Sequence, residues 1–201
     1  MFNINTIFPT SIVIGNLERG LTKEELEVVD YHKTKTYNNV GNITSLDKYI
    51  LKTQLPEIKT FIELGIKSYV DKILAPKHPL NFYITQSWIN YTSQGQFHHR
   101  HNHPNSILSG VFYFNADSEK DKIFFYNETY KQLTIPTKEF NIFNSESWWF
   151  NVKTGGLIIF PSHLTHMVAQ TISSETRVSL AFNVFANGYF GDEDNLTALH
   201  L

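Results

Sequence analysis

The chain of 201 residues contains no cysteine. This absence excludes disulfide bonds, zinc–thiolate sites and thiol nucleophiles. A metal ion bound by this chain would need His, Asp or Glu side chains as ligands. Such ligands are typical of catalytic iron, manganese or zinc sites rather than of structural zinc sites.

The sequence also lacks a strong charge of either sign and a long apolar run. Its formal net charge is -2, and no run of Lys or Arg indicates a nucleic-acid partner. The opening stretch MFNINTIFPTSIVIGNL has no basic start and is interrupted by Asn, Pro and Thr, unlike a signal peptide. No segment approaches the roughly 18 apolar residues of a membrane span. We therefore expect a soluble, cytoplasmic protein without a membrane partner.

The length and the 41% hydrophobic content indicate a single domain over residues 1–201. We expect a helical N-terminal layer over residues 1–80, a β core over residues 81–186 and a polar tail over residues 187–201.

The N-terminal layer is predicted to hold one short strand and two helices. TSIVIG is a short apolar run typical of a strand, and LTKEELEVVDYHK opens with Thr22 three residues before Glu25, which is a capping-box pattern. LPEIKTFIELGIKSYVDKIL is predicted to be an amphipathic helix that ends before Pro76. Its apolar positions, three or four residues apart, are Ile58, Ile62, Ile66, Tyr69 and Ile73.

The remainder is rich in short aromatic and β-branched segments, which predict an antiparallel sandwich or barrel. The longer segment 127–147 is of the kind that often covers a site. The predicted strands are FYITQSWINYT, ILSGVFYFN, KIFFYN, WWFNV, GLIIF, MVAQTI and RVSLAFNVF.

The octapeptide FHHRHNHP, residues 97–104, contains four histidines. In an extended chain His99, His101 and His103 would share one face, while His98 would point to the other. A His-x-His pair can supply two ligands to one metal ion, and His166 in FPSHLTHMV is the natural third. Taken alone, such a cluster is more often a solvated surface feature than a metal site.

The strand RVSLAFNVF places Arg177 and Ser179 on one side of an otherwise apolar segment. A buried arginine is costly without a partner, and a carboxylate ligand would provide one. The alternative is that Arg177 lies at a strand end and reaches solvent.

Four stretches, in this order, resemble the Fe(II)/2-oxoglutarate-dependent oxygenases, and most closely a branch of small members from bacteria and phages. They are SWIN, HNHPNSILSGVFYF, GGLIIFPSHLTHMV and RVSLAFNVF. The resemblance implies a mainly β fold with N-terminal helices and a double-stranded β-helix (jelly-roll, cupin-like) core. It also implies an iron-dependent dioxygenase that uses 2-oxoglutarate and O2 and releases succinate and CO2.

On the family's pattern His101, His103 and His166 would be the catalytic Fe(II) ligands. Arg177 would bind the far carboxylate of 2-oxoglutarate with help from Ser179. Apart from this pattern, alternation places Asn90 on one strand face with Gln86 and Trp88, where it either hydrogen-bonds the co-substrate or substrate or is a strand residue paired to the backbone. Most relatives have two histidines and one carboxylate at the metal, so His103 departs from the pattern. An alternative register, with His99 and His101 as the pair, stays open.

Two other functions stay open at this stage. A cupin-type metal dioxygenase that does not use 2-oxoglutarate would suit a three-histidine site, and a non-catalytic jelly-roll module would need no metal. The sequence names neither the prime substrate nor the oligomeric state, so a homo-oligomer also stays open.

Overall fold

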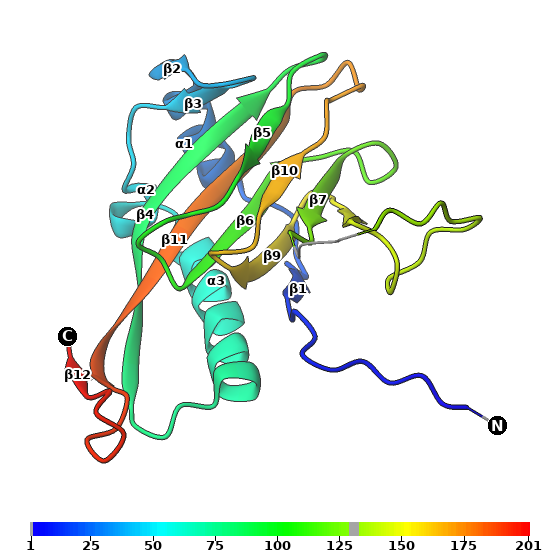
Figure 1. Ribbon diagram of the computed structural model, residues 1–201. Coiled ribbons are helices and arrows are strands. Elements are labelled where there is room, and N and C mark those ends of the chain that lie inside the picture. The colour runs from blue at the N-terminus through cyan, green and yellow to red at the C-terminus, as the bar shows by residue number, and fades with distance from the viewer. Residues whose placement is uncertain (1, 129–132) are drawn as a thin grey trace.

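The computed structural model describes residues 2–128 and 133–201. In this part of the chain, two antiparallel sheets face each other as a jelly roll (Figure 1). The predicted double-stranded β-helix core is therefore confirmed. The large sheet has the strand order β1-β9-β6-β11-β4-β3-β2, with β12 added to β11, and the small sheet has the order β5-β10-β7-β8. The large-sheet strands are β1 (Val13–Asn16), β2 (Thr36–Asn38), β3 (Ile43–Ser45), β4 (Leu80–Thr92), β6 (Leu108–Asn115), β9 (Gly156–Pro161), β11 (Arg177–Phe190) and β12 (Leu199–His200). The small-sheet strands are β5 (His98–His101), β7 (Lys122–Tyr126), β8 (Ser147–Asn151) and β10 (His166–Val168).

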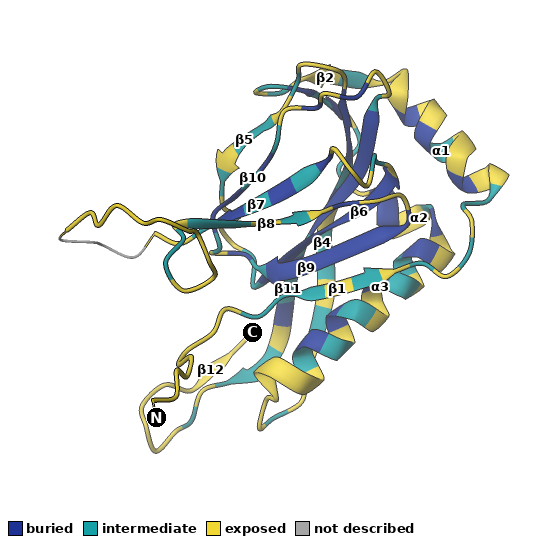
Figure 2. Ribbon diagram, turned by 90° about the vertical axis from the view of Figure 1, so that its right-hand side faces the viewer, coloured by how far each residue is buried: buried dark blue, intermediate teal, exposed yellow. Residues whose placement is uncertain are grey.

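The described part of the N-terminal layer supplies three α-helices, which cover one face of the large sheet (Figure 2). Helix α1 (Lys23–Lys33) starts at the predicted capping box, in which Thr22 and Glu25 satisfy each other's backbone N–H groups. The short α2 (Ile50–Thr53) precedes α3 (Pro56–Tyr69), which buries the predicted stripe at Ile58, Ile62, Ile66 and Tyr69.

The expected core position of Ile73 is wrong, because its side chain is 40% exposed. The last turn after α3, Val70–Leu74, is π-helical. A π turn holds more residues than an α turn, so the four-residue spacing no longer keeps the same face toward the core.

The large sheet has two buried faces with different partners. Alternate residues such as Ile89, Leu180 and Phe182 pack with the helices. The residues between them face the small sheet, where Val111 and Phe160 pack with strand residues such as Ile123, Phe125 and Val168. Arg177 and Ser179 share this inner face, so the fold directs both polar side chains into the jelly roll.

The C-terminal segments differ from the predicted strand limits. Residues 187–190 lie within β11, and β12 pairs back on them, where a polar tail was expected. MVAQTI is a strand only as far as Val168. The chain then turns to pair its backbone with another loop, since Thr171 N–H donates to Gln96 O at 2.8 Å. Among the described residues no helix is long and apolar enough to cross a membrane.

Candidate metal centre

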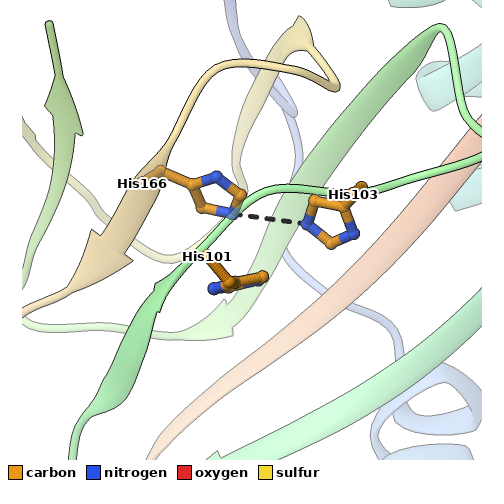
Figure 3. A group of neighbouring side chains, drawn as sticks. All are labelled: His101, His103 and His166. Carbon is orange, nitrogen blue, oxygen red and sulfur yellow. Dashed lines mark hydrogen bonds between the residues drawn. The ribbon is translucent and has the colours of Figure 1, made fainter. Parts of the chain in front are cut away.

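His101, His103 and His166 converge inside the jelly roll, with one ligand atom from each lying within 4.8 Å of the others (Figure 3). His166 stands directly opposite His101 in the pairing of β10 with β5, and His103 follows β5 by two residues. The Nε2 atoms of His103 and His166 are 3.3 Å apart. Two nitrogens that bind one ion at about 2.1 Å and near a right angle would be about 3 Å apart, so the spacing fits a shared metal ion.

Backbone carbonyls fix the orientation of two of these rings. Nδ1 of His101 lies 2.8 Å from the carbonyl oxygen of His99, and Nδ1 of His166 lies 3.0 Å from that of Leu164. In each case Nδ1–H donates to the carbonyl, and Nε2 then carries the free lone pair. A hydrogen bond of this kind is the usual way in which a protein sets the tautomer of a metal-binding histidine.

The imidazoles are held in their neutral form. Burial, together with the neighbouring imidazoles, lowers the pKa of His166 to about 2. The same two causes lower the pKa of His103 to about 4. The pKa of His101 is also lowered, chiefly by burial. Neutral imidazole is the form that binds a metal ion, so the chemistry of the donor set fits Fe(II) or a similar divalent ion.

The loop that carries His103 is tied to the end of β9. His103 N–H donates to the carbonyl of Ser162 at 2.9 Å, and Ser162 N–H donates to the carbonyl of Ile107 at 3.0 Å. The Ser162 hydroxyl lies 2.8 Å from that of Ser109, which also donates to Asn183 Oδ1 at 3.1 Å. This buried network holds His103 in place although it lies outside a strand.

The expectation that His98 points away from its neighbours is wrong. β5 has a bulge where it pairs with β10. His101 pairs with His166 and His98 pairs with Val168, so β5 advances by three residues where β10 advances by two. His98 therefore faces inward and stacks on His101, with ring centroids 4.6 Å apart. Arg100 keeps the outward direction and lies over the ring of Tyr126.

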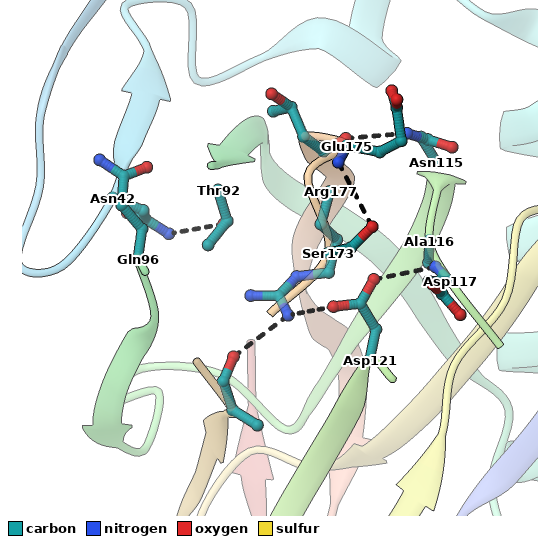
Figure 4. A network of polar contacts seen from close by, with 12 residues as sticks. Asn42, Thr92, Gln96, Asn115, Ala116, Asp117, Asp121, Ser173, Glu175 and Arg177 are labelled. Atoms are coloured by element: carbon teal, nitrogen blue, oxygen red, sulfur yellow. Dashed lines mark hydrogen bonds and ion pairs between the residues drawn. The ribbon is translucent and has the colours of Figure 1, made fainter. Parts of the chain in front are cut away.

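Arg177 is buried and paired rather than solvent-exposed. Its side chain is 2% exposed, and Nη1 donates to Oδ1 of Asp121 at 3.0 Å and to the carbonyl of Ala169 at 3.2 Å (Figure 4). Sequence reasoning identified the need for a carboxylate but missed Asp121, which lies at the end of the turn after β6. The signal was present, because a buried arginine requires a counter-charge.

A row of polar side chains lies between Arg177 and the histidines. Ser179 pairs with Asn90 on one side and with Tyr113 on the other, so the three side chains share the inner face. Trp88 lies one row further along, with its ring centroid 6.1 Å from that of His103.

Two atoms of this row are buried without a hydrogen-bond partner in the described part of the chain. They are Oδ1 of Asn90 and the hydroxyl of Tyr113, whose pKa is raised by burial. Tyr113 is buried in β6, and its unpartnered hydroxyl presents a polar group to the interior.

The segment 127–147, expected to cover a site, includes residues 129–132, which lie outside the described residues. Of its described part, Ile135, Phe140 and Phe143 are exposed. Trp148 and Trp149 follow this segment and belong to β8, as the predicted strand WWFNV requires, and their stacked ring centroids are 5.4 Å apart.

Residues 86–183 match the family model described as "Putative 2OG-Fe(II) oxygenase". The match spans slightly less than half of the chain, and it shows a similarity of this segment to that family. The matched segment contains all three converging histidines together with Arg177, Ser179 and Asn90. A comparison with curated proteins gave no match.

Solved structures of oxygenases share the fold. An oxidoreductase of the 2OG-Fe(II) oxygenase family from Burkholderia pseudomallei is 14% identical with a TM-score of 0.54, over 86% of this chain and 83% of that chain. A non-heme alpha-ketoglutarate-dependent carbocyclase from nogalamycin biosynthesis is 13% identical with a TM-score of 0.55, over 93% and 85%. An epimerase of the same dependence and biosynthesis is 11% identical with a TM-score of 0.54, over 88% and 78%. At these identities the likeness shows the fold.

Proposed function

We propose that this protein is an Fe(II)- and 2-oxoglutarate-dependent dioxygenase that hydroxylates a substrate still to be identified and releases succinate and CO2. His101, His103 and His166 are the proposed metal ligands, and Arg177 with Ser179 is proposed to bind the far carboxylate of the co-substrate. The observation that carries the proposal is the convergence of three neutral imidazoles inside the jelly roll, with a buried arginine on the same interior.

Bound Fe(II) would supply a centre at which 2-oxoglutarate and O2 react. The chain's own residues provide the remaining requirements. Nε2 of each proposed ligand supplies a lone pair, and Arg177 and the Asn90–Ser179–Tyr113 row supply hydrogen-bonding groups for the co-substrate. Phe160, whose ring centroid is 4.5 Å from that of His166, and Phe125 pack beside the cluster and exclude water from it.

The register with His101 and His103 is preferred over the one with His99 and His101. The ligand atoms of His101, His103 and His166 form the compact group, and His103 rather than His99 approaches His166 at 3.3 Å. His99 contributes its carbonyl to the orientation of His101 instead.

A second function is favoured by one observation, the histidine at position 103 where a carboxylate is usual. A three-histidine metal dioxygenase that does not use 2-oxoglutarate would have the same metal ligands. The two functions differ in their products, because the proposed one forms one succinate for each O2 consumed in coupled turnover.

The test is an anaerobic titration of Fe(II)-loaded protein with 2-oxoglutarate, followed by visible absorption. The proposed function predicts a metal-to-ligand charge-transfer band that saturates with 2-oxoglutarate and is missing in His166→Ala. A wild-type protein that binds Fe(II) but gives no band, and forms no succinate when O2 is admitted, would contradict the proposal.

A further inference from the structure

Asp121 is a buried carboxylate that the proposed mechanism does not use. Its side chain and that of Arg177 are each 2% exposed. Asp121 Oδ2 accepts the backbone N–H of Asp117 at 2.9 Å, and Oδ1 accepts Nη1 of Arg177 at 3.0 Å. The turn between β6 and β7 therefore holds the carboxylate in a fixed position beside the guanidinium.

This contact engages only one nitrogen of the guanidinium. Nη1 is shared between Asp121 and the carbonyl of Ala169, whereas Nη2 and Nε donate to none of the described residues. Figure 4 shows a second guanidinium nitrogen directed away from Asp121. Arg177 thus keeps donors for another group while its charge is already balanced.

The distribution of positive charge between the metal ion and Arg177 differs from that in a site with two histidine ligands and one carboxylate ligand. Such a site would carry +1 at the metal and +1 at a free arginine. Three neutral imidazoles leave +2 at the metal, and Asp121 brings the Arg177 pair to zero. The total is +2 in both cases, and it matches a doubly charged 2-oxo acid, but here the positive charge lies at the metal end alone.

The far end of the interior also offers an unsatisfied acceptor. Oδ1 of Asn90 is buried without a partner, and Asn90 is 3% exposed. A carboxylate cannot donate to this oxygen, whereas an amide NH2 or a hydroxyl can. The Tyr113 hydroxyl, also unpartnered, can donate or accept.

We propose that Asp121 determines co-substrate specificity by neutralising Arg177, so that the site accepts 2-oxo acids with an uncharged, hydrogen-bonding far end as well as 2-oxoglutarate. The proposal rests on the proposed function, because it takes Arg177 and Asn90 as contacts of the co-substrate. A far carboxylate meets a pair of zero net charge and gains only hydrogen bonds, while a far amide gains hydrogen bonds from Arg177 and gives one to Asn90.

The experiment is anaerobic calorimetry of Fe(II)-loaded protein with two probes of equal size, 2-oxoglutarate and its far-end amide, 2-oxoglutaramate. In the wild type the dissociation constants of the two probes should agree within about tenfold. Because Asp121 balances the charge of Arg177, the far carboxylate of 2-oxoglutarate gains little over the amide from its own charge. A preference for 2-oxoglutarate of tenfold or more would overturn the inference. This ratio is measured on the native chain and does not depend on the folding of any variant.

The same affinity ratio is then measured for Asp121→Asn, a substitution that keeps the shape of the side chain and removes its charge. The preference for 2-oxoglutarate over the amide should rise by about tenfold or more, and an unchanged ratio would overturn the inference. Asp117→Asn is the matched control, because the Asp117 side chain belongs to the same turn but bonds Glu119 N–H and Lys120 rather than Arg177.

The outcomes separate the two proposals. If the wild type holds Fe(II) but binds neither 2-oxo acid, the proposed function fails and the inference falls with it. If it binds 2-oxoglutarate strongly and the amide at least tenfold more weakly, the function stands and only the role of Asp121 is overturned.

Discussion

At the residue scale, the histidines differ because their surroundings differ. His101 and His166 each donate Nδ1–H to a carbonyl two residues earlier in the chain, while His103 is positioned through its backbone and the Ser162 network. His99 lies close to His101 but is not part of the compact group of ligand atoms. Neighbouring side chains of one type therefore have different contacts.

This difference predicts how two alanine variants bind metal. His166→Ala should lower the affinity for Fe(II), or for Mn(II) as a stable substitute, by at least about tenfold, because one of three ligands is lost. His99→Ala should keep the affinity within a few-fold, since the carbonyl that orients His101 is retained. Isothermal titration calorimetry measures both, and equal losses in the two variants would contradict the proposed ligand set.

The buried ion pair predicts a coupled effect on folding stability. Arg177→Met should lower the free energy of unfolding by about 3–5 kcal/mol, because it leaves Asp121 charged and buried without its partner. Adding Asp121→Asn to Arg177→Met should recover part of this loss. Urea unfolding monitored by circular dichroism tests the cycle, and strictly additive effects would show that the two side chains do not interact.

The set of His101, His103 and His166 was predicted from the family resemblance, because the cluster alone did not distinguish a metal site from a surface patch. The structure brings these three side chains together, and it buries Arg177 with a partner. The sequence did not reveal Asp121, whose contact depends on how the turn after β6 folds back. It also did not reveal the unpartnered hydroxyl of Tyr113, because a strand pattern does not show whether a buried hydroxyl has a hydrogen-bond partner.

At the element scale, local patterns succeeded where the backbone is regular. The capping box of α1 and the apolar stripe of α3 are both present. Alternation failed at the β5 bulge, where His98 turns inward, and helical spacing failed at the π turn that exposes Ile73. Both features depend on partners distant in sequence, so a local period cannot show them.

The close contact of α3 with the large sheet predicts how a substitution at Gly65 changes the stability of the protein. A Cβ at this position would lie 2.8 Å from Cδ1 of Ile159 and 3.1 Å from Cδ2 of Leu157. Gly65→Ala should therefore destabilise the protein by about 1–3 kcal/mol, although alanine favours helix in an isolated peptide.

A second substitution tests this explanation. Ile159→Val removes the atom that would clash, and alone should cost about 1 kcal/mol. The double variant should be more stable than the sum of the two losses predicts, as measured by thermal or chemical unfolding. A Gly65→Ala variant as stable as the wild type would show that α3 moves away from the sheet without cost.

At the scale of the whole molecule, the large sheet separates an apolar helical layer from an interior that carries charge and imidazoles. This arrangement makes the stability of the metal-free protein depend on pH. His98, His103 and His166 have folded-state pKa values of about 3, about 4 and about 2, against 6.5 for an unperturbed histidine. Between about pH 6.5 and pH 4 the unfolded chain therefore binds more protons than the folded one.

Stability should consequently fall as the pH drops through this window, by up to about 1.4 kcal/mol per pH unit for each such histidine. His98→Leu removes one of these groups without removing a proposed ligand, so it should make the dependence less steep. Urea unfolding of metal-free protein between pH 7 and pH 4 measures the slope. An identical slope in both proteins would contradict the inward, neutral placement of His98.

The central claim is that His101, His103 and His166 bind one iron ion on the interior that Arg177 shares. Anomalous diffraction at the iron edge, on anaerobic crystals grown with Fe(II) and 2-oxoglutarate, tests it most directly. The account predicts one iron peak within bonding distance of Nε2 of all three histidines, and 2-oxoglutarate extending from it to Arg177. Iron bound by a carboxylate side chain or by His99, or 2-oxoglutarate away from Arg177, would contradict it.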